Sequence, residues 1–60
     1  SRYQQAQIHA QRGAADTALT LLRQALESLD PGLLWAPNDP LLDPLRGAAA
    51  FKDLLIRLGS

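Results

Sequence analysis

Residues 14–29 read AADTALTLLRQALESL, and they carry the clearest helical pattern of the chain. Small and apolar side chains recur there at three- and four-residue spacing, which places them on one face of a helix. These residues are Ala18, Leu22, Ala25 and Leu29, flanked by Leu19, Leu21 and Leu26. Asp30-Pro31 follows, and the residue before a proline is disfavoured in the α-helical region. The pattern therefore predicts a helix over 14–29 that ends before Pro31.

The preceding residues, 1–12, contain no glycine or proline and are rich in Gln and Ala, which favour helices. One stripe of this predicted helix holds Tyr3, Ala6 and Ala10. Ile8 points to nearly the opposite side, because successive residues are rotated by about 100°. Gly13 follows where a helix end favours a left-handed residue. Residues 1–30 are therefore expected to form a hairpin of two helices.

The next part of the chain repeats one dipeptide three times, as Asp30-Pro31, Asp39-Pro40 and Asp43-Pro44. An aspartate cap followed by a proline at the first helical position is a helix start signal. Apolar residues follow each dipeptide, so three short helical turns are expected to fold back over the hairpin. Trp35 lies among them, and we expect it to pack in the core, with a role as a partner anchor as the alternative.

A last amphipathic helix is predicted over 48–58. Its apolar side chains follow the spacing i, i+3, i+4, i+7, and they are Phe51, Leu54, Leu55 and Leu58. Gly59 is expected to end the helix, and Arg57 suits the negative end of its dipole.

Composition supports an all-α class for these 60 residues. The chain has thirteen Leu and ten Ala, but no Val, two Ile and two Thr, which is too few β-branched residues for a sheet. We expect one domain, with a helical hairpin over 1–30 and short turns and a capping helix over 31–60. The chain begins without a methionine, so we expect it to be a fragment of a larger protein.

Charge and hydropathy argue against several partners. Six basic and six acidic side chains give zero formal net charge, whereas nucleic acid favours a clustered basic surface. No apolar run approaches the roughly 20 residues that span a bilayer. We therefore expect no nucleic-acid partner, no membrane and a cytoplasmic location. With no cysteine, disulfides and thiolate zinc sites are excluded.

The residues also give little support for catalysis or cofactor binding. His9 is the only histidine, and its helical neighbours offer no further metal ligands. No glycine-rich phosphate loop or nucleophile elbow is present. The prediction is a protein that is not an enzyme and that holds no cofactor or metal.

Residues 1–30 resemble a tetratricopeptide repeat, a helix–turn–helix unit with small residues where its helices cross. The matching positions are Ala6, Gly13, Ala18, Leu22 and Ala25. Arg2, Gln5 and His9 depart from the large side chains that the family prefers there. The resemblance is therefore to a degenerate, terminal repeat, the end of an α-solenoid.

Residues 39–58 resemble the tail that ends repeat arrays in bacterial proteins, with the pattern DP-x-x-DPLR followed by F-x-x-LL-x-x-L. Ala48-Ala49-Ala50 stands where an Asp-Pro-Arg is typical. Such arrays are often attached to transcription regulators, protein kinases or cyclases, so the resemblance implies a module of a larger bacterial protein.

The leading functional hypothesis is a protein-interaction or regulatory module that binds a protein or peptide. A purely structural cap or self-association segment is the first alternative, and a helical nucleic-acid module is the second. In repeat arrays the first helix lines the concave groove, so the resemblance implies a partner face made of Tyr3, Gln7, Ala10 and Gln11. The residues expected to pack the helices together are Ala6, Gly13, Ala18, Leu22, Ala25, Trp35, Phe51, Leu54, Leu55 and Leu58.

Overall fold

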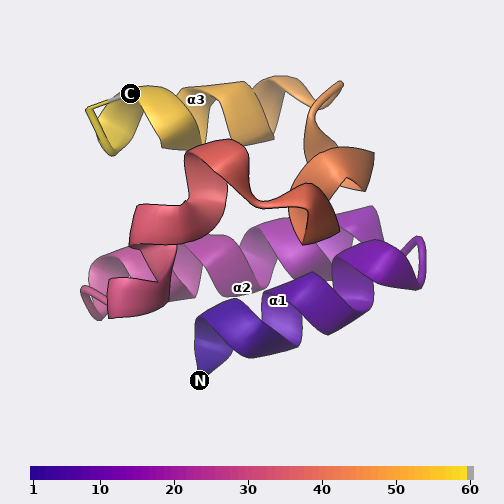
Figure 1. Cartoon of the computed structure of the whole chain (residues 1–60), viewed down its shortest axis with the longest axis horizontal. Helices are drawn as coiled ribbons and strands as arrows, with labels where there is room; N and C mark the ends of the chain where they lie inside the picture. Colours follow the sequence, from indigo (N-terminus) through magenta and orange to yellow (C-terminus); the bar gives the residue numbers. More distant parts are fainter. Residues whose placement is uncertain (60) are drawn as a thin grey trace.

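Two α-helices open the chain in the computed structural model, which describes residues 1–59 (Figure 1). Helix α1 (Arg2–Gln11) begins with a capping box, in which the Ser1 hydroxyl accepts from the Gln4 backbone N–H at 3.2 Å and the Gln4 side chain accepts from the Ser1 amino group. Gly13 makes the turn with φ of +80°, a conformation that glycine adopts without steric cost. Helix α2 (Ala15–Glu27) then runs back beside α1.

The two helices pack closely through small side chains. Ala6 on α1 and Ala18 and Ala25 on α2 are completely buried, together with Leu22. Small residues let two helix backbones approach, which is the packing that the spacing in residues 14–29 predicts.

Helix α2 ends at an unusual residue. Leu29 has φ of +56°, in the left-handed region that only glycine adopts without strain. The backbone N–H of Asp30 then donates to the carbonyl of Ala25 at 2.9 Å, which satisfies one of the free carbonyls at the helix end.

Two 3-10 helices follow, η1 (Pro31–Asn38) and η2 (Pro40–Leu45). Asp30 and Asp39 are their N-caps, and each carboxylate accepts a backbone N–H two residues later at 2.9 Å. The expectation of a third short turn is wrong. Asp43-Pro44 lies inside η2, and the Asp43 carboxylate accepts from Arg46 instead of starting a helix.

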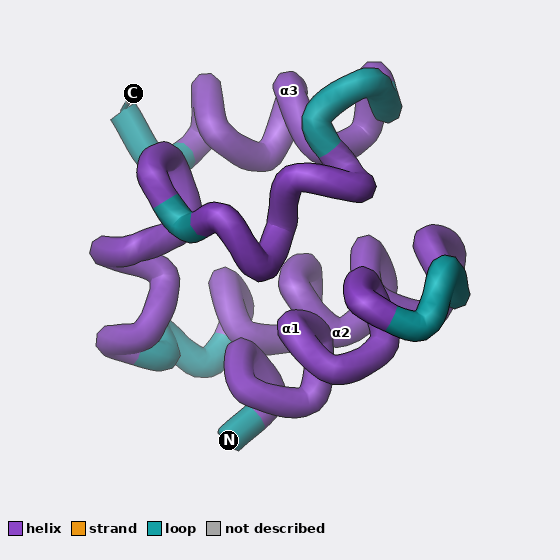
Figure 2. Tube along the Cα trace, turned by 45° about the vertical axis from the view of Figure 1, so that its right-hand side comes forward, coloured by secondary structure: helices purple, strands orange, loops and turns teal. Residues whose placement is uncertain are grey.

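Helix α3 (Ala49–Arg57) closes the fold. Figures 1 and 2 show three layers, with α1 and α2 on one side, α3 on the other, and η1 and η2 between them. Phe51 and Leu54 of α3 are buried, whereas Leu55 and Leu58 are half-buried against the core. Within residues 1–59 the chain is therefore all-α, as its composition predicts. The predicted second segment, 31–60, ends at Ser60, which lies outside the described residues.

The buried residues of the second half recur every three positions. They are Leu33, Ala36, Asp39, Leu42, Leu45, Phe51 and Leu54, with Ala48 half-buried in the same series. A 3-10 helix has about 3.0 residues per turn, so residues three apart lie directly above one another. This period places one row of side chains against the hairpin.

Trp35 does not belong to that row, and the expectation that it packs in the core is wrong. Its side chain is 69% exposed. Leu33 and Ala36 take the inner face of η1, so Leu34 and Trp35 between them point outward.

Gly32 of η1 lies directly against Tyr3 of α1. A methyl group at this position would lie 2.7 Å from Cδ2 and 2.8 Å from Cγ of Tyr3. These atoms lie at the base of a buried ring that cannot swing away. We therefore expect Gly32→Ala to lower the free energy of unfolding by about 1–3 kcal/mol in urea denaturation.

Gly47→Ala is the matched control, because nothing lies within 4 Å of a methyl group there. Its unfolding free energy should stay unchanged or rise by less than about 1 kcal/mol. Equal effects of the two substitutions would contradict the packing of η1 on Tyr3.

Candidate functional site

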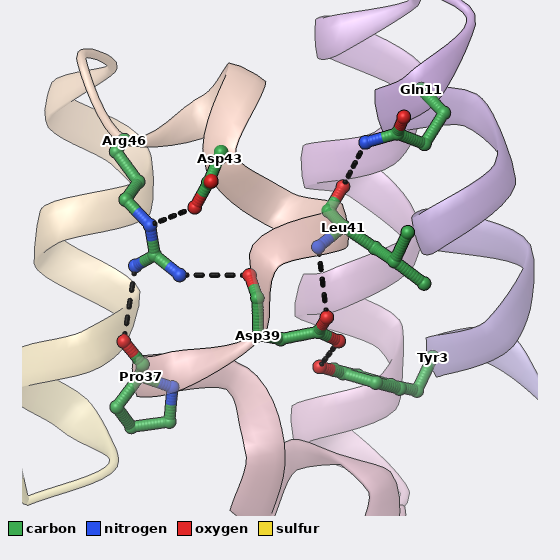
Figure 3. Close-up of polar contacts among 7 residues, drawn as sticks. All are labelled: Tyr3, Gln11, Pro37, Asp39, Leu41, Asp43 and Arg46. Carbon is green, nitrogen blue, oxygen red and sulfur yellow. Dashed lines mark hydrogen bonds and ion pairs between the residues drawn. The ribbon is translucent and has the colours of Figure 1, made fainter.

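The buried carboxylate of Asp39 joins α1 to the second half of the chain. Only 8% of this residue is exposed. Its Oδ2 accepts from the Tyr3 hydroxyl at 2.5 Å, and its Oδ1 accepts from the Leu41 N–H (Figure 3). Oδ2 also accepts from Gln7 Nε2 at 2.6 Å. The one charged member of the buried row is thus fully engaged by hydrogen bonds, as burial of a carboxylate requires.

Arg46 holds the same segment from the other side (Figure 3). Its guanidinium donates to the carbonyls of Pro37 at 3.1 Å and Asp39 at 2.8 Å, and to the Asp43 carboxylate at 2.8 Å. The same group lies 5.5 Å from the centroid of the Phe51 ring, a distance at which a cation and an aromatic face attract. Arg46 therefore fixes the path of η2 relative to α3.

These contacts shift the pKa values of Tyr3 and Asp39. Burial, with the hydrogen bond to Asp39, raises the pKa of Tyr3 above its usual range. Burial also acts to raise the pKa of Asp39, but its hydrogen bonds and the Arg46 charge outweigh it and hold that pKa below its usual range. These shifts favour a neutral phenol beside an ionised carboxylate, which is the pair that the hydrogen bond needs.

The structure corrects the expected partner face on α1. Tyr3 and Ala10 are buried, so the prediction that they face an open groove is wrong. Gln7 is half-buried against Asp39, and Gln11 is exposed but donates from Nε2 to the Leu41 carbonyl at 2.9 Å. The chain's own η2 occupies this face, which the helical spacing of α1 alone could not reveal.

An apolar surface lies instead where α2, η1 and α3 meet. Leu29 is 81% exposed and Leu34 is 84% exposed. They border a hollow of about 260 Å³ that Leu26, Leu33 and Leu58 also line. Leu29, Leu34 and the neighbouring Trp35 are hereafter called the apolar surface. The sequence patterns considered above do not predict this surface, although the three-residue period of η1 directs Leu34 and Trp35 outward.

Two other hollows lie elsewhere on the chain. One, of about 350 Å³, lies beside the exposed Ile8 and is bordered by Leu41. The other, of about 170 Å³, lies between α2 and α3, and its charged lining residues are Arg23, Asp53 and Arg57.

The described residues 1–59 contain no group of three or more metal-ligating side chains placed to hold an ion. None of the helices in this part of the chain is both long enough and apolar enough to cross a membrane.

Comparisons of the chain with models of protein families, with curated proteins and with solved structures find no match. The basis for a function is therefore the arrangement of the chain's own residues.

Ionisation of Tyr3 gives a test of the buried network. Because its folded pKa is raised, its contribution to stability is complete below about pH 10, the ordinary value for tyrosine, and is lost as pH rises beyond it. Tyr3 is the only tyrosine, so ultraviolet absorbance of tyrosinate should show native ionisation well above pH 10.

Tyr3→Phe should flatten the loss of unfolding free energy above pH 10, measured by urea denaturation at several pH values. A native tyrosine that ionises near pH 10 would show that the hydroxyl is not held by Asp39.

Proposed function

We propose that the chain is a protein-interaction module and that the apolar surface is its docking site. The observation that carries this proposal is that exposed Leu29 and Leu34 border one hollow, with exposed Trp35 next to Leu34 in the sequence. Exposed apolar side chains that gather in this way commonly mark a protein-binding site on a monomer. Tryptophan is also among the residues that contribute most binding energy at interfaces.

The arrangement of the core supports the same proposal. Only the face of η1 that packs against the rest of the chain can bury apolar side chains, and Leu33 and Ala36 occupy that face. Leu34 and Trp35 therefore remain in water unless another molecule covers them. Burying such side chains stabilises by about 1.5–3 kcal/mol each, which gives a partner a reason to bind there.

The proposal extends to the context of the chain, as the end of a tetratricopeptide-like array in a larger bacterial protein, with a cytoplasmic location. The buried alanines between α1 and α2 support it. Ile8 supports it too, because this residue is exposed on the outer side of α1, where a preceding helical hairpin would pack. A terminal unit covers the last face of an array and leaves its own surface to water or a partner.

Self-association is the second candidate, because the same apolar surface could meet its copy. Sedimentation across a concentration series separates the two. A monomer at all concentrations excludes the self-association candidate, whereas a dimer that Leu34→Ser abolishes would favour it over a foreign partner.

Binding is tested by selecting a displayed library of random peptides on the full chain. Selected peptides should lose at least about tenfold in affinity for Leu34→Ser, since an apolar interface contact of this size contributes more than about 1 kcal/mol. Trp35 is the only tryptophan, so its emission should shift to shorter wavelength as a peptide covers it.

Ile56→Ser is the matched control. Ile56 is 70% exposed and does not border the hollow, so peptide affinity should stay unchanged. Peptides that bind Leu34→Ser as tightly as the native chain would overturn the proposed docking site.

A further inference from the structure

The apolar hollow lies next to a hollow between α2 and α3 that carries charged side chains. Arg23, Asp53 and Arg57 line this second hollow, together with Ala50 and Leu54. The two hollows are close neighbours along both helices. Arg23 precedes Leu26 by three residues on α2, and Leu54 of α3 precedes the C-cap residue Leu58 by four, which corresponds to about 4.5–6 Å of helix. We call the two hollows together the α2–α3 groove.

The charges at the two ends of the groove differ. The Arg57 guanidinium lies 3.3 Å from the Asp53 carboxylate, so that pair is balanced. Arg23 forms no ion pair with any residue of the described part of the chain, and its guanidinium only approaches the Thr20 hydroxyl at 3.4 Å. The basic end therefore carries one uncompensated positive charge.

The carboxylate at the apolar end, that of Asp30, already accepts hydrogen bonds from within the chain. Asp30 accepts from the Gly32 N–H at 2.9 Å and from the Tyr3 N–H at 3.3 Å. It serves the chain as a helix cap and does not offer a free acceptor to a partner. The apolar end thus favours hydrophobic side chains, whereas the basic end favours a negative one.

We propose that the α2–α3 groove binds a partner segment that carries leucine-like side chains and, about one helical turn away, an aspartate or glutamate. The apolar side chains enter the hollow beside Leu29 and Leu34, and the carboxylate meets Arg23. Arginine suits this role because its planar guanidinium can donate two parallel hydrogen bonds to one carboxylate. The charge at one end also sets the direction in which the segment lies, since complementary charges fix register across an interface.

This inference rests on the proposed function. One peptide selection shows whether the inference alone fails or the proposed function fails with it. A random peptide library is selected in parallel on the native chain and on the Arg23→Gln variant, which keeps the Arg57–Asp53 pair intact. Peptides from the native chain should be enriched in leucine-like residues and in Asp or Glu at a fixed spacing from them. Peptides from the variant should keep the leucine-like residues and lose the acidic enrichment.

A selected peptide then provides the direct measurement. Replacing its acidic residue with the matching amide should weaken binding to the native chain by about fivefold, as expected for a partly exposed ion pair. The same replacement should have no effect on binding to the Arg23→Gln variant. A higher salt concentration should weaken binding of the acidic peptide more than binding of its amide counterpart.

Lys52→Gln is the matched control for charge. Lys52 is an exposed cation of α3 that does not line the groove, so the acidic preference should persist. Leucine-rich peptides without an acidic preference would overturn this inference and leave the proposed function standing. Peptides that ignore both Leu34→Ser and Arg23→Gln, or a library that yields no binder, would overturn both.

Discussion

The structure depends on one buried carboxylate, that of Asp39. It is the only charged residue in a row of otherwise apolar side chains that recurs every third position from η1 to α3. Tyr3 and Gln7 of α1 donate to it, so the row can pack against the hairpin only when these donors are in place. A buried carboxylate without its donors costs far more than the loss of one surface contact. The segment therefore has one strongly preferred position on α1.

That position determines which surfaces remain for other molecules. Because η2 covers the face of α1 that contains Tyr3, that face is not open to a partner. The three-residue period of η1 then directs Leu34 and Trp35 outward. The proposed partner site therefore lies not on the first helix but beside α2 and α3, where one hollow is apolar and its neighbour carries the charge of Arg23, unpaired within residues 1–59.

The elements with a helical period of 3.6 could be predicted from the sequence together with their buried faces, whereas for the two 3-10 helices only the starts at Asp30-Pro31 and Asp39-Pro40 could be predicted. Residues 14–29 contain α2, and Phe51 and Leu54 mark the buried face of α3, because their spacing already encodes which side is apolar. Trp35 was misplaced because size and hydrophobicity suggest burial, whereas the local 3-10 geometry decides direction. The role of Asp39 could not be predicted, because an Asp-Pro dipeptide indicates only a helix cap. The residues that donate to the Asp39 carboxylate, Gln7 and Tyr3, lie 32 and 36 residues away in the sequence. The expectation that Tyr3 and Ala10 line an open groove fails because helical spacing shows which residues share a face of α1, but not that η2 covers that face.

The most direct test is a double-mutant cycle between Tyr3 and Asp39. The unfolding free energies of the native chain, Tyr3→Phe, Asp39→Asn and the double variant are measured by urea denaturation at neutral pH. A hydrogen bond to a buried charge predicts a coupling energy of about 1.5–3 kcal/mol, so that the double variant loses much less than the sum of the single losses. Losses that add to within about 0.5 kcal/mol would show that Asp39 does not hold the second half of the chain on α1.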